Sequence, residues 1–361
     1  MDHPLLSLIR TSPSPVPIAL AVYPGIALTG ARVVDIVTDP RAQAETQLAL
    51  HERLRTPVLI SAMDLSAEAE AFGSPVRFVE DEVPTVEERL VDSRQTVGAL
   101  EVPSPGEKRT RVHLEAVSMM RRGAPGAIVL GNLTGPLTLA GRLFGVSEAL
   151  ELTVTDAGTL HLLIEKTSAF VVQYARAFRA AGAHGAIVAE PLAGLLSPAD
   201  LARFSSAYVR RLVDAVDDPG FLVVLHSCSL RAIHLARILE AGARMYHFGS
   251  PMDMPAALAS AADRVVLAGN LDPTAVFFQS TSEEVARRTG ELLDAAAAYR
   301  GFAPSSGCDL PPGTPLANLE AFCTTVRRRN ADEACRRADG ASGTSRAGGA
   351  SRTIGPSGQE H

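Results

Sequence analysis

The stretch FLVVLHSCSLRAIHLARILEAGARMYHFGS, residues 221–250, contains two short apolar runs separated by a helical pattern. The first run is followed directly by His226 and Cys228, and the second by Gly249 and Ser250. Near-continuous apolar runs of this length are typical of strands in a parallel sheet that is covered on both faces. The stretch therefore predicts a strand–helix–strand unit of an α/β protein.

The same rhythm recurs along the body of the chain. Each apolar run is bounded by Gly, Pro or polar residues and is followed by a helical pattern, and this alternation predicts parallel βαβ units. Eight such units predict closure into a (β/α)8 TIM barrel. The eight runs are Ile18–Val22, Pro57–Ser61, Ala127–Gly131, Ala186–Ala189, Phe221–Leu225, Arg244–Phe248, Val265–Ala268 and Gly301–Pro304.

Three segments fall outside this rhythm. The first is an N-terminal extension over residues 1–16. We expect the barrel to occupy residues 17–330. The stretch from Ala67 to Arg111 predicts an excursion with a hairpin at one end of the barrel. From Ala331 the chain is rich in Gly, Ser, Ala and Arg and has no apolar periodicity. Too little apolar surface is available there to offset the entropy of ordering, so we expect a disordered tail over 331–361.

The composition excludes several classes of partner. Hydrophobic residues make up 46% of the 361 residues, charged residues make up 20%, and the net charge is −6. This acidic balance argues against nucleic acid or an anionic membrane as a partner, because both favour a basic face. The N-terminus does not resemble a signal peptide, and no window approaches the ~18 apolar residues of a membrane span. We therefore expect a cytoplasmic protein.

Polar residues follow the predicted strands at their C-terminal ends, where the ligand site of a parallel barrel lies. Because the loops after the strands gather at this end, we expect these side chains to converge. They are Glu190, His226, Cys228, Ser250, Asp253, Asn270, Asp272, Cys308 and Asp309.

Within this set, His226, Cys228 and Cys308 form an H-x-C…C arrangement supplied by two strand ends. One imidazole and two thiolates suit Zn²⁺, which prefers four tetrahedral ligands. Three protein ligands would leave one position open, which is typical of a catalytic zinc site.

The spacing alone leaves other interpretations open. A buried histidine and two inert thiols would give the same pattern, since free cysteine is commonly buried. Cys323, His234 and His247 are rival ligands, although Cys323 lies in a helical pattern that would face the core. Cys335 lies in the expected tail and is the weakest candidate.

Three carboxylates have both a structural and a functional interpretation. Glu190 could serve as an acid or base, or it could cap the next helix. Asp272, in GNLDP, could shape a turn or take part in binding. Asp64, in SAMDLS, has the position of a helix N-cap as much as that of a catalytic acid.

Six segments carry a family resemblance that runs from about Pro17 to Val326. The chain resembles the uroporphyrinogen decarboxylase superfamily, and within it the branch typified by methylcobamide:coenzyme M methyltransferases. The segments are LTGARVVDIVTD (28–39), MDLSAEAEAFGSPVRF (63–78), GPLTLAGRLFG (135–145), EPLAGLLSPADLARF (190–204), GNLDP (269–273) and GCDLPPGTPLANLEAF (307–322).

The H-x-C…C arrangement separates the branches of this superfamily. In the methyltransferase branch these residues bind zinc, so the resemblance implies that His226, Cys228 and Cys308 are zinc ligands. Decarboxylases of the heme pathway work without a metal and carry an N-terminal arginine-rich segment that binds substrate carboxylates. The corresponding region here, AVYPGIALTGAR, has only Arg32 as a cation. The chain departs from the branch at Ser229, where a glycine is usual, and this puts the acceptor's identity in doubt.

The resemblance implies zinc-dependent transfer of a methyl group from a methyl-corrinoid, such as methylcobalamin, to a small-molecule thiol resembling coenzyme M or homocysteine. Glu190, Asp272 and Asp64 are then the candidate catalytic residues, and Asn270 and Ser250 the candidates for cofactor binding. The chain has no DxHxxG segment for binding a corrinoid, so we expect the corrinoid to arrive on a separate carrier protein or as free methylcobalamin.

Two alternatives accompany this prediction. The first is a metal-free uroporphyrinogen decarboxylase that uses Asp64 beside a tetrapyrrole. The second is a non-enzymatic barrel that binds a corrinoid or a thiol as a sensor or carrier. In this case zinc would have only a structural role, in holding loops together. The sequence does not identify the methyl donor, the oligomeric state or the methyl acceptor. Folate is an alternative acceptor to a thiol. A sulfonate-bearing thiol would need a cationic partner, for which the sequence does not rank Arg32, Arg77, Arg142 and Arg244.

Overall fold

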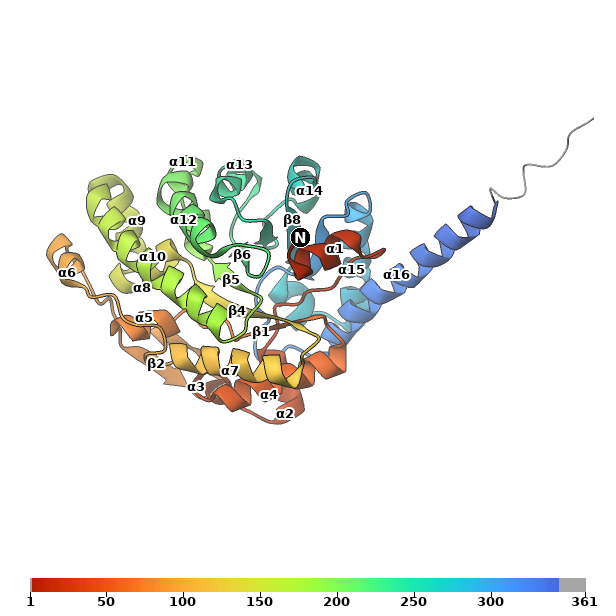
Figure 1. Ribbon diagram of the computed structural model, residues 1–361, viewed down its shortest axis with the longest axis horizontal. Coiled ribbons are helices and arrows are strands. Elements are labelled where there is room, and N and C mark those ends of the chain that lie inside the picture. The colour runs from red at the N-terminus through yellow and green to blue at the C-terminus, as the bar shows by residue number, and fades with distance from the viewer. Residues whose placement is uncertain (1, 344–361) are drawn as a thin grey trace, which may run out of the picture.

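The computed structural model describes the backbone of residues 2–343 and the side chains of residues 2–329. Its centre is one curved parallel sheet of seven strands in the order β1-β4-β5-β6-β7-β8-β9, and helices surround this sheet (Figure 1). The predicted α/β fold is confirmed. The strands are β1 (Val58–Ile60), β4 (Ile128–Thr134), β5 (Gly185–Ala189), β6 (Leu222–Ser227), β7 (Met245–Phe248), β8 (Val266–Leu271) and β9 (Phe302–Ser306).

The eighth predicted strand is not formed: the run Ile18–Val22 has no strand assignment, although it lies alongside β9. The amide of Ile18 donates to the carbonyl of Pro304 (3.0 Å), but Pro304 has no amide hydrogen with which to continue the ladder. Toward β1, a side chain takes the place of a backbone ladder. The side-chain amide of Gln47 donates to the carbonyl of Ala21 and accepts from the amide of Ile60 in β1. The side chain of Gln47 therefore links this run to β1 where a backbone ladder is missing.

Helices follow most strands, as the alternating pattern predicts. Within the described chain, no helix is long and apolar enough to cross a membrane. The α-helices are α1 (Pro4–Thr11), α2 (Ile26–Thr29), α3 (Val33–Thr38), α4 (Pro40–Leu54), α5 (Ala67–Phe72), α6 (Arg94–Ala99), α7 (Thr110–Gly123), α8 (Pro136–Phe144), α9 (Val146–Thr155), α10 (Ala157–Ala180), α11 (Pro198–Leu201), α12 (Ala207–Val216), α13 (Leu235–Ile238), α14 (Met254–Ala261), α15 (Ser282–Ala296) and α16 (Leu316–Gly343). Short helical turns of other types are η1 (Tyr23–Gly25), η2 (Pro191–Leu195), η3 (Ala202–Ser206), η4 (Ala232–His234), η5 (Leu239–Ala241) and η6 (Pro273–Phe278).

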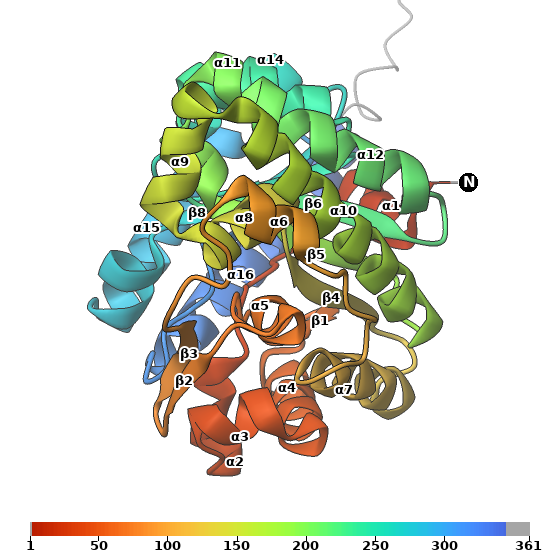
Figure 2. The same ribbon diagram turned by 90° about the vertical axis from the view of Figure 1, so that its left-hand side faces the viewer.

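The segment between β1 and α7 interrupts the barrel. It contains α5, α6 and a two-stranded antiparallel sheet formed by β2 (Val76–Val79) and β3 (Glu82–Val86). Strand β3 contacts α3. The β2–β3 sheet lies on the same side of the molecule as α3 and α5 (Figure 2).

Helix α16 changes the expected C-terminal boundary. Residues 331–343 continue this helix, whereas the composition of the chain from Ala331 onward predicts disorder. Ala, Glu and Arg, which are common in ADEACRRAD, favour helix, and extending an existing helix avoids the cost of a new nucleus. The rest of the expected tail, 344–361, lies outside the described residues.

The expected N-terminal extension contains α1, which covers one end of the barrel. Leu5 and Leu6 are fully buried in the apolar cluster that also contains Ile60 of β1. His3 Nε2 lies 2.7 Å from the carbonyl oxygen of His184, the residue that precedes β5. Helix α1 therefore lies at the N-terminal ends of the strands, opposite the end where the sequence predicts a ligand site.

We expect Leu6→Ala to lower the free energy of unfolding by ~2–5 kcal/mol, because it opens a cavity where α1 meets the barrel. Leu28→Ala is the control: Leu28 is 39% exposed, so its change should stay within ~0.5 kcal/mol. Urea unfolding followed by circular dichroism measures both. Equal effects of the two variants would show that α1 does not contribute to the barrel core.

Candidate metal centre

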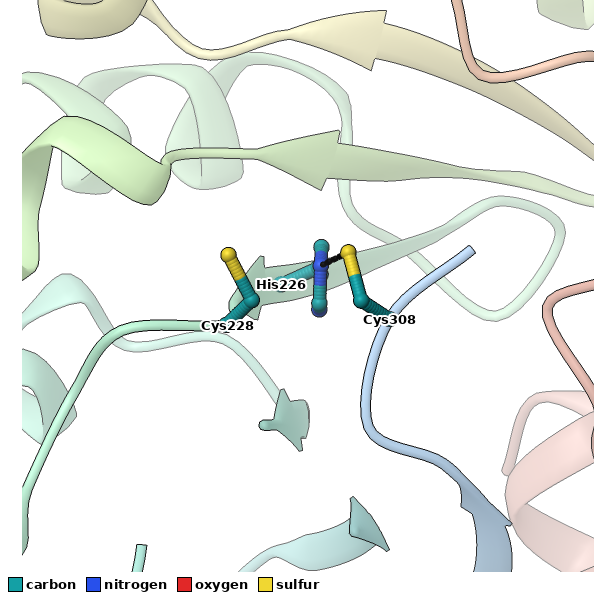
Figure 3. Close-up of side chains that lie close together, drawn as sticks. All are labelled: His226, Cys228 and Cys308. Carbon is teal, nitrogen blue, oxygen red and sulfur yellow. Dashed lines mark hydrogen bonds between the residues drawn. The ribbon is translucent and has the colours of Figure 1, made fainter. Parts of the chain in front are cut away.

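His226, Cys228 and Cys308 meet at the C-terminal end of the barrel. His226 lies near the end of β6, Cys228 follows that strand, and Cys308 follows β9. Their potential ligand atoms all lie within 4.8 Å of one another. Figure 3 shows the three side chains next to one another, with the histidine ring beside the sulfur of Cys308. Among the residues whose side chains are described, this is the one such group of three His, Cys or acidic residues.

Two glycines allow the loops that carry the cysteines to meet. A Cβ atom on Gly249, after β7, would overlap the backbone carbonyl of Cys228. A Cβ atom on Gly307 would lie 2.9 Å from the backbone nitrogen of Ser250. Because backbone atoms cannot move aside as a flexible side chain can, only glycine fits these two positions. Neither glycine was among the predicted site residues, and the available signal was a glycine directly after a predicted strand in FGS and SGC.

A chain of hydrogen bonds fixes which nitrogen of His226 is free to bind a metal. Ser305 Oγ donates to the carbonyl of Ser306 (2.9 Å), so it accepts from His247 Nε2 (2.7 Å). Burial lowers the pKa of His247 well below its ordinary value, so the ring is neutral and its Nδ1 carries no proton. This Nδ1 and the backbone carbonyl of His247 lie 2.9 and 3.3 Å from His226 Nδ1, which must therefore be the donor.

In the neutral form of His226, the lone pair is therefore on Nε2. This atom lies 3.5 Å from Cys308 Sγ, and the dashed line in Figure 3 marks this contact. A neutral imidazole whose other nitrogen donates to a fixed acceptor is the usual arrangement of a metal-binding histidine.

The two thiols are unequal without a cation. A hydrogen bond with Cys308 lowers the pKa of Cys228, and the same contact together with burial raises the pKa of Cys308. Two adjacent thiolates repel each other, so one proton stays between them. A divalent cation would remove this repulsion and favour loss of that proton. Two thiolates and one neutral imidazole fit Zn²⁺ with one position open.

The rival ligands have other contacts. Cys323 is fully buried in the apolar core, and burial raises its pKa to about 11. In His234, Nδ1 accepts from the amide of Arg231 (3.1 Å), and Nε2 lies 3.2 Å from the carbonyl oxygen of Leu196. His247 orients His226, as described above. Cys335 lies outside the residues whose side chains are described.

Glu190 follows β5, but its carboxylate binds the N-terminus of α8. The residue is fully buried, and the amides of Leu137 and Thr138 donate to its two oxygens (2.9 and 2.8 Å). Burial raises the pKa of the Glu190 carboxyl to about 7. Its backbone amide donates to the carbonyl of His226 (2.8 Å), so the residue adjoins the cluster through its main chain. The Glu190 side chain therefore caps α8, which follows β4. It does not cap η2, the helical turn that follows Glu190 in the sequence.

Asp64 is held in a buried ion pair. Its Oδ1 accepts from the amide (2.9 Å) and the hydroxyl (2.6 Å) of Ser66, and its Oδ2 binds the guanidinium of Arg109. Arg109 also binds Glu70 at 2.6 Å. Both oxygens of Asp64 therefore already have partners.

The other three predicted site residues contact the loops after β7 and β8. Ser250 Oγ donates to Asp272 Oδ2 (3.0 Å), and Asp272 Oδ1 accepts from two amides that begin η6. Asn270 Nδ2 donates to the carbonyls of Gly249 (3.2 Å) and Met252 (2.7 Å). Asn270 thus fixes the loop whose glycine lies against Cys228. Ser229 donates its hydroxyl to the carbonyl of Pro191 (2.7 Å).

Two charged residues at this end of the barrel were not predicted as site residues. Arg109 binds Asp64, and Glu68 accepts from the amide (2.7 Å) and hydroxyl (2.9 Å) of Thr134. Burial raises the pKa of Glu68 to about 7. Neither residue follows an apolar run, so a search of strand ends passes over them. The available signal for Glu68 was an acidic residue among the alanines of SAEAEAF.

Comparison with known proteins identifies the family. Residues 12–329 match the Uroporphyrinogen decarboxylase (URO-D) family, and the chain belongs to it. Similar proteins include the methylcobamide:CoM methyltransferase MtbA of Methanosarcina acetivorans, with 27% identity over 78% of this chain and 84% of that protein. A uroporphyrinogen decarboxylase of Azoarcus sp. is 29% identical over 81% of this chain and 84% of its own.

A solved structure shares the fold. A methyltransferase from Methanosarcina mazei has a TM-score of 0.81 at 20% identity and covers 90% of this chain and 97% of its own. The family and the fold are therefore shown, and the relatives include both methyltransferases and decarboxylases.

We expect His247→Leu to weaken Zn²⁺ binding about tenfold or more, because the nearer of the two acceptors that orient His226 is lost. His247→Asn is the matched control, since its side-chain oxygen can still accept a hydrogen bond near Cβ, and it should stay within about threefold of the wild type. Competition with a chromophoric chelator measures both. Equal loss in the two variants would contradict the orienting role.

We expect Glu190→Gln to lower the free energy of unfolding by ~1–3 kcal/mol, because an amide side chain has one acceptor oxygen for two buried N–H groups. Zinc content should stay unchanged. Denaturant unfolding and metal analysis of the same preparation measure the two effects. Unchanged stability would contradict the capping role of this carboxylate.

Proposed function

We propose that the protein is a zinc-dependent methyltransferase that moves a methyl group from a methyl-corrinoid to a thiol. The observation that carries this proposal is the group formed by His226, Cys228 and Cys308 at the C-terminal end of the barrel. It offers three soft or borderline donors, and Asp309, the residue after Cys308, lines a pocket. Three protein ligands would leave a fourth position for substrate. The methyltransferases among the relatives agree with this assignment.

Each residue of the group has a defined task in this reaction. His226 presents the lone pair of Nε2, because His247 holds its other nitrogen as a donor. Cys228 provides a thiolate, and Cys308 must lose its proton when the metal is loaded. Bound zinc would lower the pKa of the acceptor thiol, so that it reacts as a thiolate near neutral pH.

The transfer itself balances without an added oxidant or reductant. The acceptor sulfur gives an electron pair to the methyl carbon, and the pair of the cobalt–carbon bond stays on cobalt, which passes from Co(III) to Co(I). The thiol proton leaves to solvent. The protein positions the acceptor, while the corrinoid supplies the leaving group. We propose a separate carrier protein as the source of the corrinoid.

The decarboxylase alternative is less well supported by the contacts of Asp64. Both oxygens of this carboxylate are engaged by Ser66 and Arg109, and its side chain is fully buried. A tetrapyrrole would have to displace a buried ion pair in order to reach it, and such displacement is costly. The two cysteines would also have no task in a metal-free decarboxylation.

The purified protein should carry about one zinc per chain, and Cys308→Ser should lose most of it. Cys323→Ser is the matched control, because this thiol lies in the apolar core away from the group and its variant should retain the metal. With zinc restored, methylcobalamin and a thiol should lose the absorbance of the methyl–cobalt bond.

Two results would contradict the proposal. Zinc below about a tenth of an equivalent, with no difference between the cysteine variants, would remove the basis for a metal centre. A zinc-loaded protein that stays inactive with coenzyme M, homocysteine and other thiols would favour a sensor or carrier.

A further inference from the structure

A pocket of about 230 Å³ opens beside the metal centre. Asp309, which directly follows Cys308, forms part of its lining. Residues of β3 and the loop after β1 form other walls, and Arg142 of α8 contributes a guanidinium. The pocket is therefore placed to receive the part of a substrate that extends away from the candidate ligands.

Arg142 is a cation without a hydrogen-bond acceptor or ion-pair partner among the residues whose side chains are described. Burial lowers its pKa, which reflects the cost of removing this charge from water. Asp64 acts on it electrostatically, but that carboxylate is already paired with Arg109. An unpaired guanidinium is expensive to keep half-buried unless a ligand supplies the anion.

The other arginines that the sequence analysis considered have different surroundings. Arg32 pairs with Asp35 (2.7 Å) and Glu80 (3.0 Å). Arg244 pairs with Asp217 at 2.6 Å, and Arg77 is exposed on β2. Of these candidates, only Arg142 lines the pocket.

We propose that Arg142 is the specificity-determining residue for the acceptor, and that it selects a thiol bearing a carboxylate or a sulfonate. This inference rests on the proposed function. The thiol would occupy the open position at the metal centre, and the acidic group would pair with the guanidinium across the pocket. Arginine suits this task because its planar fork can donate two hydrogen bonds to either anion.

The test compares thiols that differ in charge. The probes are 3-mercaptopropionate, 2-mercaptoethanesulfonate, neutral 2-mercaptoethanol and cationic cysteamine, each used with zinc-loaded enzyme and methylcobalamin. For wild type we expect lower KM values with the two acids than with the neutral thiol. Arg142→Met should reduce this preference about tenfold to a hundredfold, because charge-assisted hydrogen bonds are lost. Arg142→Lys should restore part of it, since it keeps the charge but not the fork.

Arg77→Met is the matched control, because it removes an exposed cation outside the pocket and should leave the preference unchanged. Thermal melting of each variant checks that the fold is intact. A wild-type enzyme without preference for acids, or an equal rise in KM for charged and neutral thiols in Arg142→Met, would overturn the proposal.

A binding measurement separates this inference from the proposed function. Calorimetric titration of zinc-loaded protein with 3-mercaptopropionate and with 2-mercaptoethanol needs no methyl donor and no turnover. A preference for the acid that disappears in Arg142→Met would support the anion subsite even if methyl transfer fails. Absence of that preference in an enzyme that does transfer methyl groups would overturn the subsite and leave the methyltransferase assignment standing.

Discussion

The candidate site depends on one hydrogen-bonded chain that runs across the C-terminal end of the sheet. It leads from the carbonyl of Ser306 through Ser305 and His247 to His226. Because its first member is a carbonyl, which can only accept, every proton along the chain has a fixed position. The order β6-β7-β8-β9 brings the members together from distant parts of the sequence. The free lone pair on His226 Nε2 is the result.

Buried carboxylates organise the opposite side of this end. Glu68 holds the last residue of β4, and Glu190 holds the first amides of α8. Both satisfy backbone groups that would otherwise be buried without partners, and such groups are costly. This arrangement fixes the start of α8, and α8 carries Arg142 toward the pocket. Structural caps and a candidate specificity residue thus belong to one assembly.

Some features follow from the local pattern of the sequence. Seven of the eight apolar runs form strands, because a run that is apolar on both faces suits a covered parallel sheet. The strand-end rule also identified His226, Cys228 and Cys308, since residues directly after parallel strands gather at one edge. The missing eighth strand was not predictable from apolar character alone. It depends on a proline in the neighbouring strand β9 and on a glutamine from α4.

The sequence by itself determined the α/β class, the family and three candidate metal ligands, because these depend on residue type and on short-range periodicity. Only the tertiary structure decided which polar groups are already satisfied. It assigned Glu190 to a helix cap, Asp64 to an ion pair and His247 to orienting His226. Among the side chains of residues 2–329, it left Arg142 in the pocket without an ion-pair partner. The physical reason is that a polar group's role depends on its partners in space, and these partners come from distant parts of the chain.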